Sequence, residues 1–186
     1  MTNGFSPLTV ADYAAQALTT DQRSDSGSLT FPLLGLFGET GSLLSEVKKK
    51  QRDRASYIGY AGAVVEELGD VLWYLTTVAA RGGLTLGDIA ANLDRGYSDW
   101  QRAGDTTVSF ASLQPEIMPR PAEPSAAFEK TLLQLAGEIG LLVTDHEAGR
   151  LTDNQSALAS RLIAITYGWN RKPLSRILLH GGYGSE

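Results

Sequence analysis

Three carboxylates interrupt an otherwise apolar helical pattern, and this feature constrains the chain most. Around Glu66, Glu67 and Asp70, aliphatic residues recur at spacings of three and four, which predicts a long helix with one buried face: Val64, Val65, Leu68, Val71, Leu72, Leu75 and Val78. Asp70 is a surface neighbour of both glutamates on such a helix, and the like charges repel one another. The helix gains from these side chains only if a cation lies among them, so a divalent metal ion is a candidate. A solvated acidic face is the alternative interpretation.

A second acidic stretch lies upstream. Glu39 and Glu46 are seven residues apart, almost two helical turns, so they share one face of a predicted helix. Lys48, Lys49 and Lys50 follow near the end of that helix, where cations also favour the helix dipole. Two helices with inward carboxylates and lysines nearby can hold metal ions and a polyphosphate.

Charge and cysteine content exclude several classes of function. Among the 186 residues, Lys+Arg 16 against Asp+Glu 21 give a net charge of -5, which argues against nucleic acid or an anionic membrane as a partner. The absence of cysteine excludes disulfides, thiolate metal sites and a cysteine nucleophile. No apolar run is long enough to span a bilayer, and residues 1–5 lack the pattern of a signal peptide. We therefore expect a cytoplasmic protein.

The pattern of caps and apolar residues predicts an all-α fold, since no convincing alternating strand pattern is present. Thr9 with Asp12, Thr85 with Asp88, and Thr152 with Gln155 form capping boxes, and Thr30 is a further cap. Helices are expected at residues 9–18, 30–51, 57–80, 85–95, 125–146, 152–169 and 173–179. Three glycines lie inside these helices, where we expect them to permit close helix packing: Gly38, Gly41 and Gly69.

The chain divides into a helical domain with the acidic site (1–102), a proline-rich linker or strap (103–124) and a second helical half (125–186). Residues 36–43 align with residues 135–142 through matching leucines, a Gly-Glu pair and a second glycine, which predicts a degenerate internal repeat. Glu138 and Asp145 then correspond to Glu39 and Glu46. No second acidic pair follows them, so we expect these two side chains to be solvated or structural. Neither His146 nor His180 stands three residues after a glutamate, which argues against a di-iron site.

A family resemblance is carried by four stretches of the chain: 9–19, 34–41, 67–75 and 83–93. It is strongest in the run Glu-Leu-Gly-Asp-Val-Leu-Trp-Tyr-Leu at 67–75. With these motifs the chain resembles the MazG-like all-alpha nucleoside triphosphate pyrophosphohydrolases. The resemblance implies a helical bundle that assembles into a homodimer or a larger oligomer. It also implies Mg2+-dependent hydrolysis, with Mn2+ as a substitute, of a nucleoside triphosphate to the monophosphate and pyrophosphate.

The family pattern is Glu-x-x-Glu on one helix and Glu-x-x-Asp on the next, which assigns Glu39, Glu67 and Asp70 as metal ligands. Ser42 stands where the fourth carboxylate belongs, and its hydroxyl brings no charge to a metal ion. A catalytically impaired nucleotide-binding or scaffold protein of the same fold is therefore the alternative function. A helical interaction protein ranks last, because no long exposed apolar stripe or basic tail is present.

The remaining roles follow from the needs of water attack on a triphosphate. Glu46 or Glu66 is the predicted base that orients the water, and either can replace the missing carboxylate. Lys48 or Lys49 neutralises the phosphate tail as a point charge. Trp73 or Tyr74 can stack on a nucleotide base, although aromatic residues at helical spacing are also typical of a core.

Overall fold

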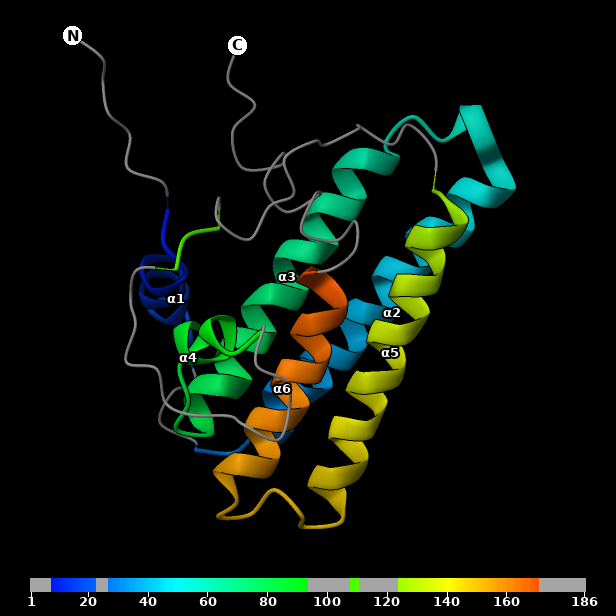
Figure 1. Cartoon of the computed structure of the whole chain (residues 1–186). Helices are drawn as coiled ribbons and strands as arrows, with labels where there is room; N and C mark the ends of the chain where they lie inside the picture. Colours follow the sequence, from blue (N-terminus) through cyan, green and yellow to red (C-terminus); the bar gives the residue numbers. More distant parts are fainter. Residues whose placement is uncertain (1–7, 23–26, 94–107, 111–123, 171–186) are drawn as a thin grey trace, which may run out of the picture.

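The computed structural model describes residues 8–22, 27–93, 108–110 and 124–170 (Figure 1). Apart from an isolated bridge between Thr9 and Ser109, these residues contain no β-structure, and the predicted all-α fold is confirmed. A 3-10 turn at Arg54–Ser56 follows the second helix, so the third begins three residues later than predicted. The α-helices are α1 (Val10–Leu18), α2 (Thr30–Asp53), α3 (Tyr60–Arg81), α4 (Leu86–Ala91), α5 (Ala126–Glu147) and α6 (Gln155–Asn170).

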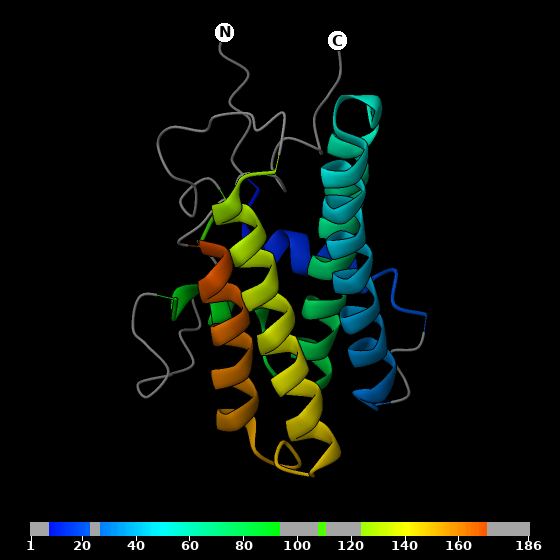
Figure 2. The same cartoon turned by 90° about the vertical axis from the view of Figure 1, so that its right-hand side faces the viewer.

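Two antiparallel helical hairpins form the body of the molecule. α2 and α3 make the first hairpin, α5 and α6 make the second, and α5 lies alongside α2 with its direction reversed (Figures 1 and 2). α1 and the short α4 contact each other and pack against α3, while α4 also contacts α6. Aliphatic side chains from all six helices join one hydrophobic core, as the spacings of three and four predict.

Local capping explains where most helices begin. The Thr9 and Thr85 hydroxyl oxygens each accept a hydrogen bond from the backbone N–H three residues on, as predicted, and Ser125 caps α5 in the same way. The Thr30 cap was wrong: Thr30 is already helical, and its N–H donates to the Ser28 hydroxyl at 3.2 Å.

The predicted cap of α6 was also wrong. The Asn154 side chain, not Thr152, accepts the N–H of Ala157 at 3.1 Å. The Gln155 amide donates instead to the carbonyl oxygens of Gly82 and Gly83, at 3.3 and 3.4 Å. Gln155 thus links the start of α6 to the end of α3, a contact between residues that are remote in the sequence.

The glycines that permit close packing are not the predicted ones. A Cβ at Gly38, Gly41 or Gly69 would meet no atom within 4 Å, so these positions border open space. A Cβ at Gly35 would lie 2.1 Å from the Tyr74 ring, and one at Gly82 would lie 2.0 Å from Leu158. Close approach therefore occurs between α2 and α3 at Gly35, and between the end of α3 and α6 at Gly82.

Residues 108–110 and residue 124 are the described parts of the predicted strap. The Val10 N–H donates to the Val108 carbonyl at 2.8 Å, and the Phe110 ring meets the Tyr13 ring edge-on at a centroid distance of 5.6 Å. The rest of the predicted strap and the helix predicted at 173–179 lie outside the described residues. The helix predicted to reach residue 95 was too long: α4 ends at Ala91, and the N–H of its C-cap Asn92 donates to the Ile89 carbonyl at 3.2 Å. Among the described helices, none has the length and apolar character needed to cross a membrane.

Candidate metal centre

Three predicted site residues come together on the first hairpin. Glu39 lies in the middle of α2, and Glu67 and Asp70 lie one turn apart on α3. One carboxylate oxygen from each side chain falls within 4.8 Å of the other two. The cluster is fixed from beneath by leucines of both helices, because Leu36, Leu43 and Leu68 have no exposed surface. The apolar seam of the hairpin thus holds the three carboxylates toward one point.

The cluster is short of positive charge. Burial and the neighbouring charges of Glu39, Asp70 and Glu46, together with a hydrogen bond to Glu39, raise the pKa of Glu67 to about 7. Burial and the charge of Glu66 also raise the pKa of Asp70. Within the described ranges, none of these three carboxylates forms an ion pair with lysine or arginine. Such an arrangement favours either a shared proton or a bound cation.

Glu46 is held differently from the cluster, although it lies on the same helix. Its buried carboxylate accepts hydrogen bonds from the Lys49 ammonium and the Tyr57 hydroxyl. The bond from Lys49, followed by the bond from Tyr57, lowers the pKa of Glu46. A carboxylate whose charge is stabilised by an ammonium group and a hydroxyl donor is a weak proton acceptor. This geometry therefore favours an electrostatic role for Glu46 over that of a base.

Tyrosine side chains border the cluster, and two of them were not predicted from the sequence. Burial and the charge of Asp70 raise the pKa of Tyr13, on α1, to about 12. Burial and the charges of Glu39 and Asp70 likewise raise the pKa of Tyr74. Tyr57, beyond the end of α2, is the hydroxyl donor to Glu46. These phenols stay protonated at neutral pH and can donate hydrogen bonds beside the carboxylates.

The other predicted site residues differ in exposure and in their partners. Glu66 is exposed on α3, next to the cluster, and its charge acts on Asp70. Lys48 is exposed, and within the described part of the chain it makes no ion pair, whereas Lys49 pairs with Glu46. The Trp73 indole N–H donates to the Ala17 carbonyl at 3.1 Å and to the Thr20 hydroxyl at 2.8 Å. These bonds tie Trp73 to the end of α1, which favours the structural interpretation, and base stacking stays a prediction.

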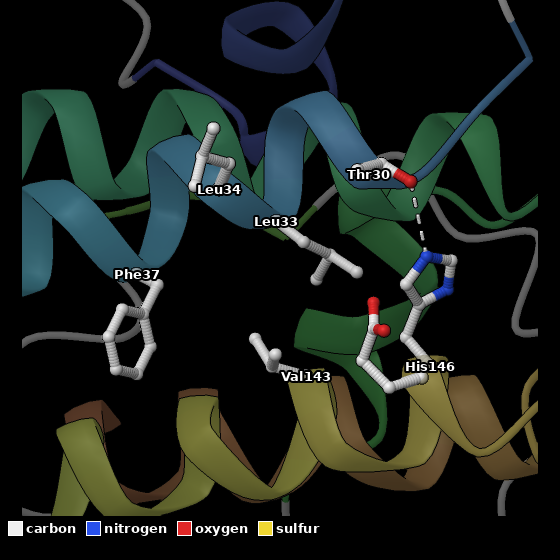
Figure 3. Close-up of a pocket in the computed structure, with 7 residues that line it drawn as sticks. Thr30, Leu33, Leu34, Phe37, Val143 and His146 are labelled. Atoms are coloured by element: carbon white, nitrogen blue, oxygen red, sulfur yellow. Dashed lines mark hydrogen bonds between the residues drawn. The ribbon is translucent and has the colours of Figure 1, made fainter.

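A separate groove lies between the start of α2 and the end of α5. It encloses about 180 Å³ and is lined mainly by apolar side chains, with Leu33, Leu34 and Phe37 on one wall and Val143 on the other (Figure 3). Thr30 and His146 close one end with a contact of 3.4 Å between the hydroxyl and the imidazole nitrogen. Its lining suits apolar contacts rather than a phosphate chain, so it is distinct in chemistry from the acidic cluster.

The donor set fits a hard divalent cation. Carboxylate oxygens are the ligands that Mg2+ and Mn2+ prefer, and no soft or imidazole donor belongs to the cluster. The raised pKa of Glu67 indicates that a positive charge would stabilise the cluster at this point. Glu39, Glu67 and Asp70 therefore have the chemistry of a site for Mg2+ or Mn2+.

Comparison with known proteins finds a family model that matches this hairpin. Residues 29–95 match the MazG nucleotide pyrophosphohydrolase domain. The matched MazG segment contains α2, α3 and α4, and with them every carboxylate of the cluster. The resemblance predicted from the sequence is confirmed over this segment. No curated protein and no solved structure gave a significant match.

Proposed function

We propose that this protein hydrolyses a nucleoside triphosphate to the monophosphate and pyrophosphate with a divalent cation. The observation that supports this most is the convergence of Glu39, Glu67 and Asp70 within the segment that matches the MazG domain. The matched domain is described as a nucleotide pyrophosphohydrolase domain. The groove between α2 and α5 is lined mainly by apolar side chains, so it does not compete as a phosphate site.

In the proposed reaction Glu39, Glu67 and Asp70 would hold Mg2+ or Mn2+, and the ion would supply charge neutralisation for phosphate oxygens and a lowered pKa for the attacking water. Lys48 is exposed and free of ion pairs in the described chain, so it is the better candidate than Lys49 for the phosphate tail. Of the two predicted bases, Glu66 is the better candidate, because its carboxylate is not neutralised as that of Glu46 is. The open space beside Gly38, Gly41 and Gly69 leaves room for a ligand next to the carboxylates.

Glu46 supports activity despite the serine at position 42. Ser42 lies one turn after Glu39, and Glu46 lies one turn further along the same helix. The charge of Glu46 is the smallest of the contributions that raise the pKa of Glu67, and this supports an electrostatic action of Glu46 on the cluster. We therefore propose that Glu46 replaces the missing fourth carboxylate electrostatically, and that the impaired scaffold is the less favoured alternative.

The test is release of pyrophosphate from each ribo- and deoxyribonucleoside triphosphate with Mg2+. We expect Glu67→Gln to lower the rate at least about 100-fold, since even outer-shell changes at metal sites cost 10- to 100-fold. Glu147→Gln removes the same charge from an exposed position on α5 and should keep the wild-type rate. Equal rates for wild type and Glu67→Gln, or no pyrophosphate from any substrate, would reject the proposal.

A further inference from the structure

The two hairpins bury their helices in the same register. The buried positions 33, 36, 40, 43 and 46 of α2 recur in α5 ninety-nine residues later, at 132, 135, 139, 142 and 145. The buried positions 64, 68, 71 and 72 of α3 recur in α6 ninety-four residues later, at 158, 162, 165 and 166. The second hairpin also runs opposite to the first, as a twofold relation between them requires (Figures 1 and 2).

This register identifies which residues stand in corresponding places. Glu138 corresponds to Glu39, and Asp145 corresponds to Glu46. On the partner helix, Arg161 takes the place of Glu67, and Ala164 takes the place of Asp70. The sequence match of residues 36–43 with 135–142 gives the same offset independently of the burial.

Arg161 pairs with the counterparts of Glu39, which belongs to the cluster, and of Glu46, which lies beside it. Its Nε atom donates to the Asp145 carboxylate at 2.5 Å, and its Nη1 atom lies 3.9 Å from the Glu138 carboxylate. Arg150 also pairs with Asp145, at 2.6 Å. Together the two guanidinium groups lower the pKa of Asp145, the opposite of what the unpaired cluster does to Glu67.

We propose that the α5–α6 hairpin contains a silenced copy of the cation site, in which the Arg161 guanidinium stands where the α2–α3 hairpin binds its divalent ion. One substitution removes a ligand and supplies a permanent positive charge, so Glu138 and Asp145 are retained without a metal ion. The chain then carries one working centre, and its second hairpin serves as the packing partner of the first. This inference rests on the proposed function for the ion of the first hairpin.

The test restores the acidic pair with Arg161→Glu and Ala164→Asp together. Titration of metal-free protein with Mn2+ should show twice the wild-type number of bound ions. Ala164→Asp alone is the matched control, because it keeps Arg161 in place, and it should bind the wild-type number. A folded double variant, checked by circular dichroism, that binds only the wild-type number would overturn the inference.

The same titration separates this inference from the proposed function. Binding by the wild type with the same number of ions in the double variant would reject the inference and keep the proposed metal centre, whereas no binding by the wild type would reject the metal centre of the first hairpin and the inference with it. If the double variant does not fold, Arg161→Gln provides the test of the inference. This variant leaves Glu138 and Asp145 without the guanidinium group that they share. Mn2+ should then raise its melting temperature more than that of wild type, and an equal shift would overturn the inference.

Discussion

At the scale of single residues, the proposed cation site depends on carboxylates that the protein holds together against their mutual repulsion. Burial and the neighbouring carboxylates raise the pKa of Glu67 to about 7. Tyr13, Tyr57 and Tyr74 surround the acidic groups with protonated hydroxyls. A site of this kind stores destabilisation in the empty state that a bound cation relieves.

The pH dependence of stability follows from this shift. Below its ordinary pKa of 4.5, Glu67 is protonated in both folded and unfolded chains and contributes nothing. Between 4.5 and about 7 the unfolded chain ionises first, so the folded state binds more protons and loses stability as pH rises. In EDTA, the melting temperature should therefore fall across this window, with Asp70 adding the same sign.

Glu67→Gln should flatten that decline and raise the melting temperature of the metal-free protein at neutral pH, although we expect it to lower the proposed hydrolysis rate. Thermal unfolding followed by circular dichroism at several pH values measures both effects. The carboxyls with lowered pKa, Glu46 and Asp145, lose their contribution only at more acidic pH, so they do not obscure the window. An identical slope in wild type and Glu67→Gln would contradict the assignment of the shift to Glu67.

At the scale of elements, the α2–α3 seam decides whether the cluster forms. Gly35 lies one turn before Glu39, and Tyr74 lies one turn after Asp70, so their contact sets the spacing of the helices beside the site. Gly35→Ala would place a Cβ 2.1 to 2.5 Å from three atoms of the rigid Tyr74 ring. We expect a loss of about 1–3 kcal/mol in the free energy of unfolding, as for other overpacked sites.

Gly38→Ala is the matched control for this substitution. It changes the same residue type one turn later in the same helix, where the new Cβ meets nothing within 4 Å. Relief of the helix-interior glycine should stabilise the protein by roughly 0.5–1 kcal/mol. Urea unfolding measures both variants, and equal free energies for the two would show that the Gly35–Tyr74 contact does not set the seam.

A buried ion pair fixes the end of α3 to the chain after α1. The Arg81 guanidinium donates to both Asp21 oxygens, at 2.9 and 2.8 Å, and the two side chains are only 4% and 3% exposed. Arg81→Met would leave the Asp21 carboxylate buried without this partner, which typically costs about 3–5 kcal/mol. Urea unfolding should show this loss, and Arg81→Met with Asp21→Asn should recover part of it. A change below about 1 kcal/mol for Arg81→Met would contradict the structural role of the pair.

At the scale of the whole molecule, periodicity and caps were sufficient to predict the helices, because these signals are local. Aliphatic spacing located the buried face of α3, and two threonine caps located the starts of α1 and α4. What the sequence could not provide were contacts between distant segments. The spacing of Gln155 from Thr152 is that of a capping box, but the Gln155 side chain binds the end of α3 instead. The spacing alone could not reveal this contact.

The same distinction between local signals and long-range contacts applies to the candidate site. Glu39, Glu67 and Asp70 could be grouped from the sequence, since helical spacing places the last two together and the family pattern supplies the first. Tyr13 could not, because only the fold brings α1 beside α3. The homodimer that the resemblance implies stays a prediction.

Calorimetric titration of metal-free protein with Mn2+ measures whether Glu39, Glu67 and Asp70 bind a divalent cation. We expect saturable binding by wild type and by Glu147→Gln, with affinity at least about 10-fold weaker in Asp70→Asn. Equal binding by wild type and Asp70→Asn, or no heat from wild type at all, would contradict the cation site.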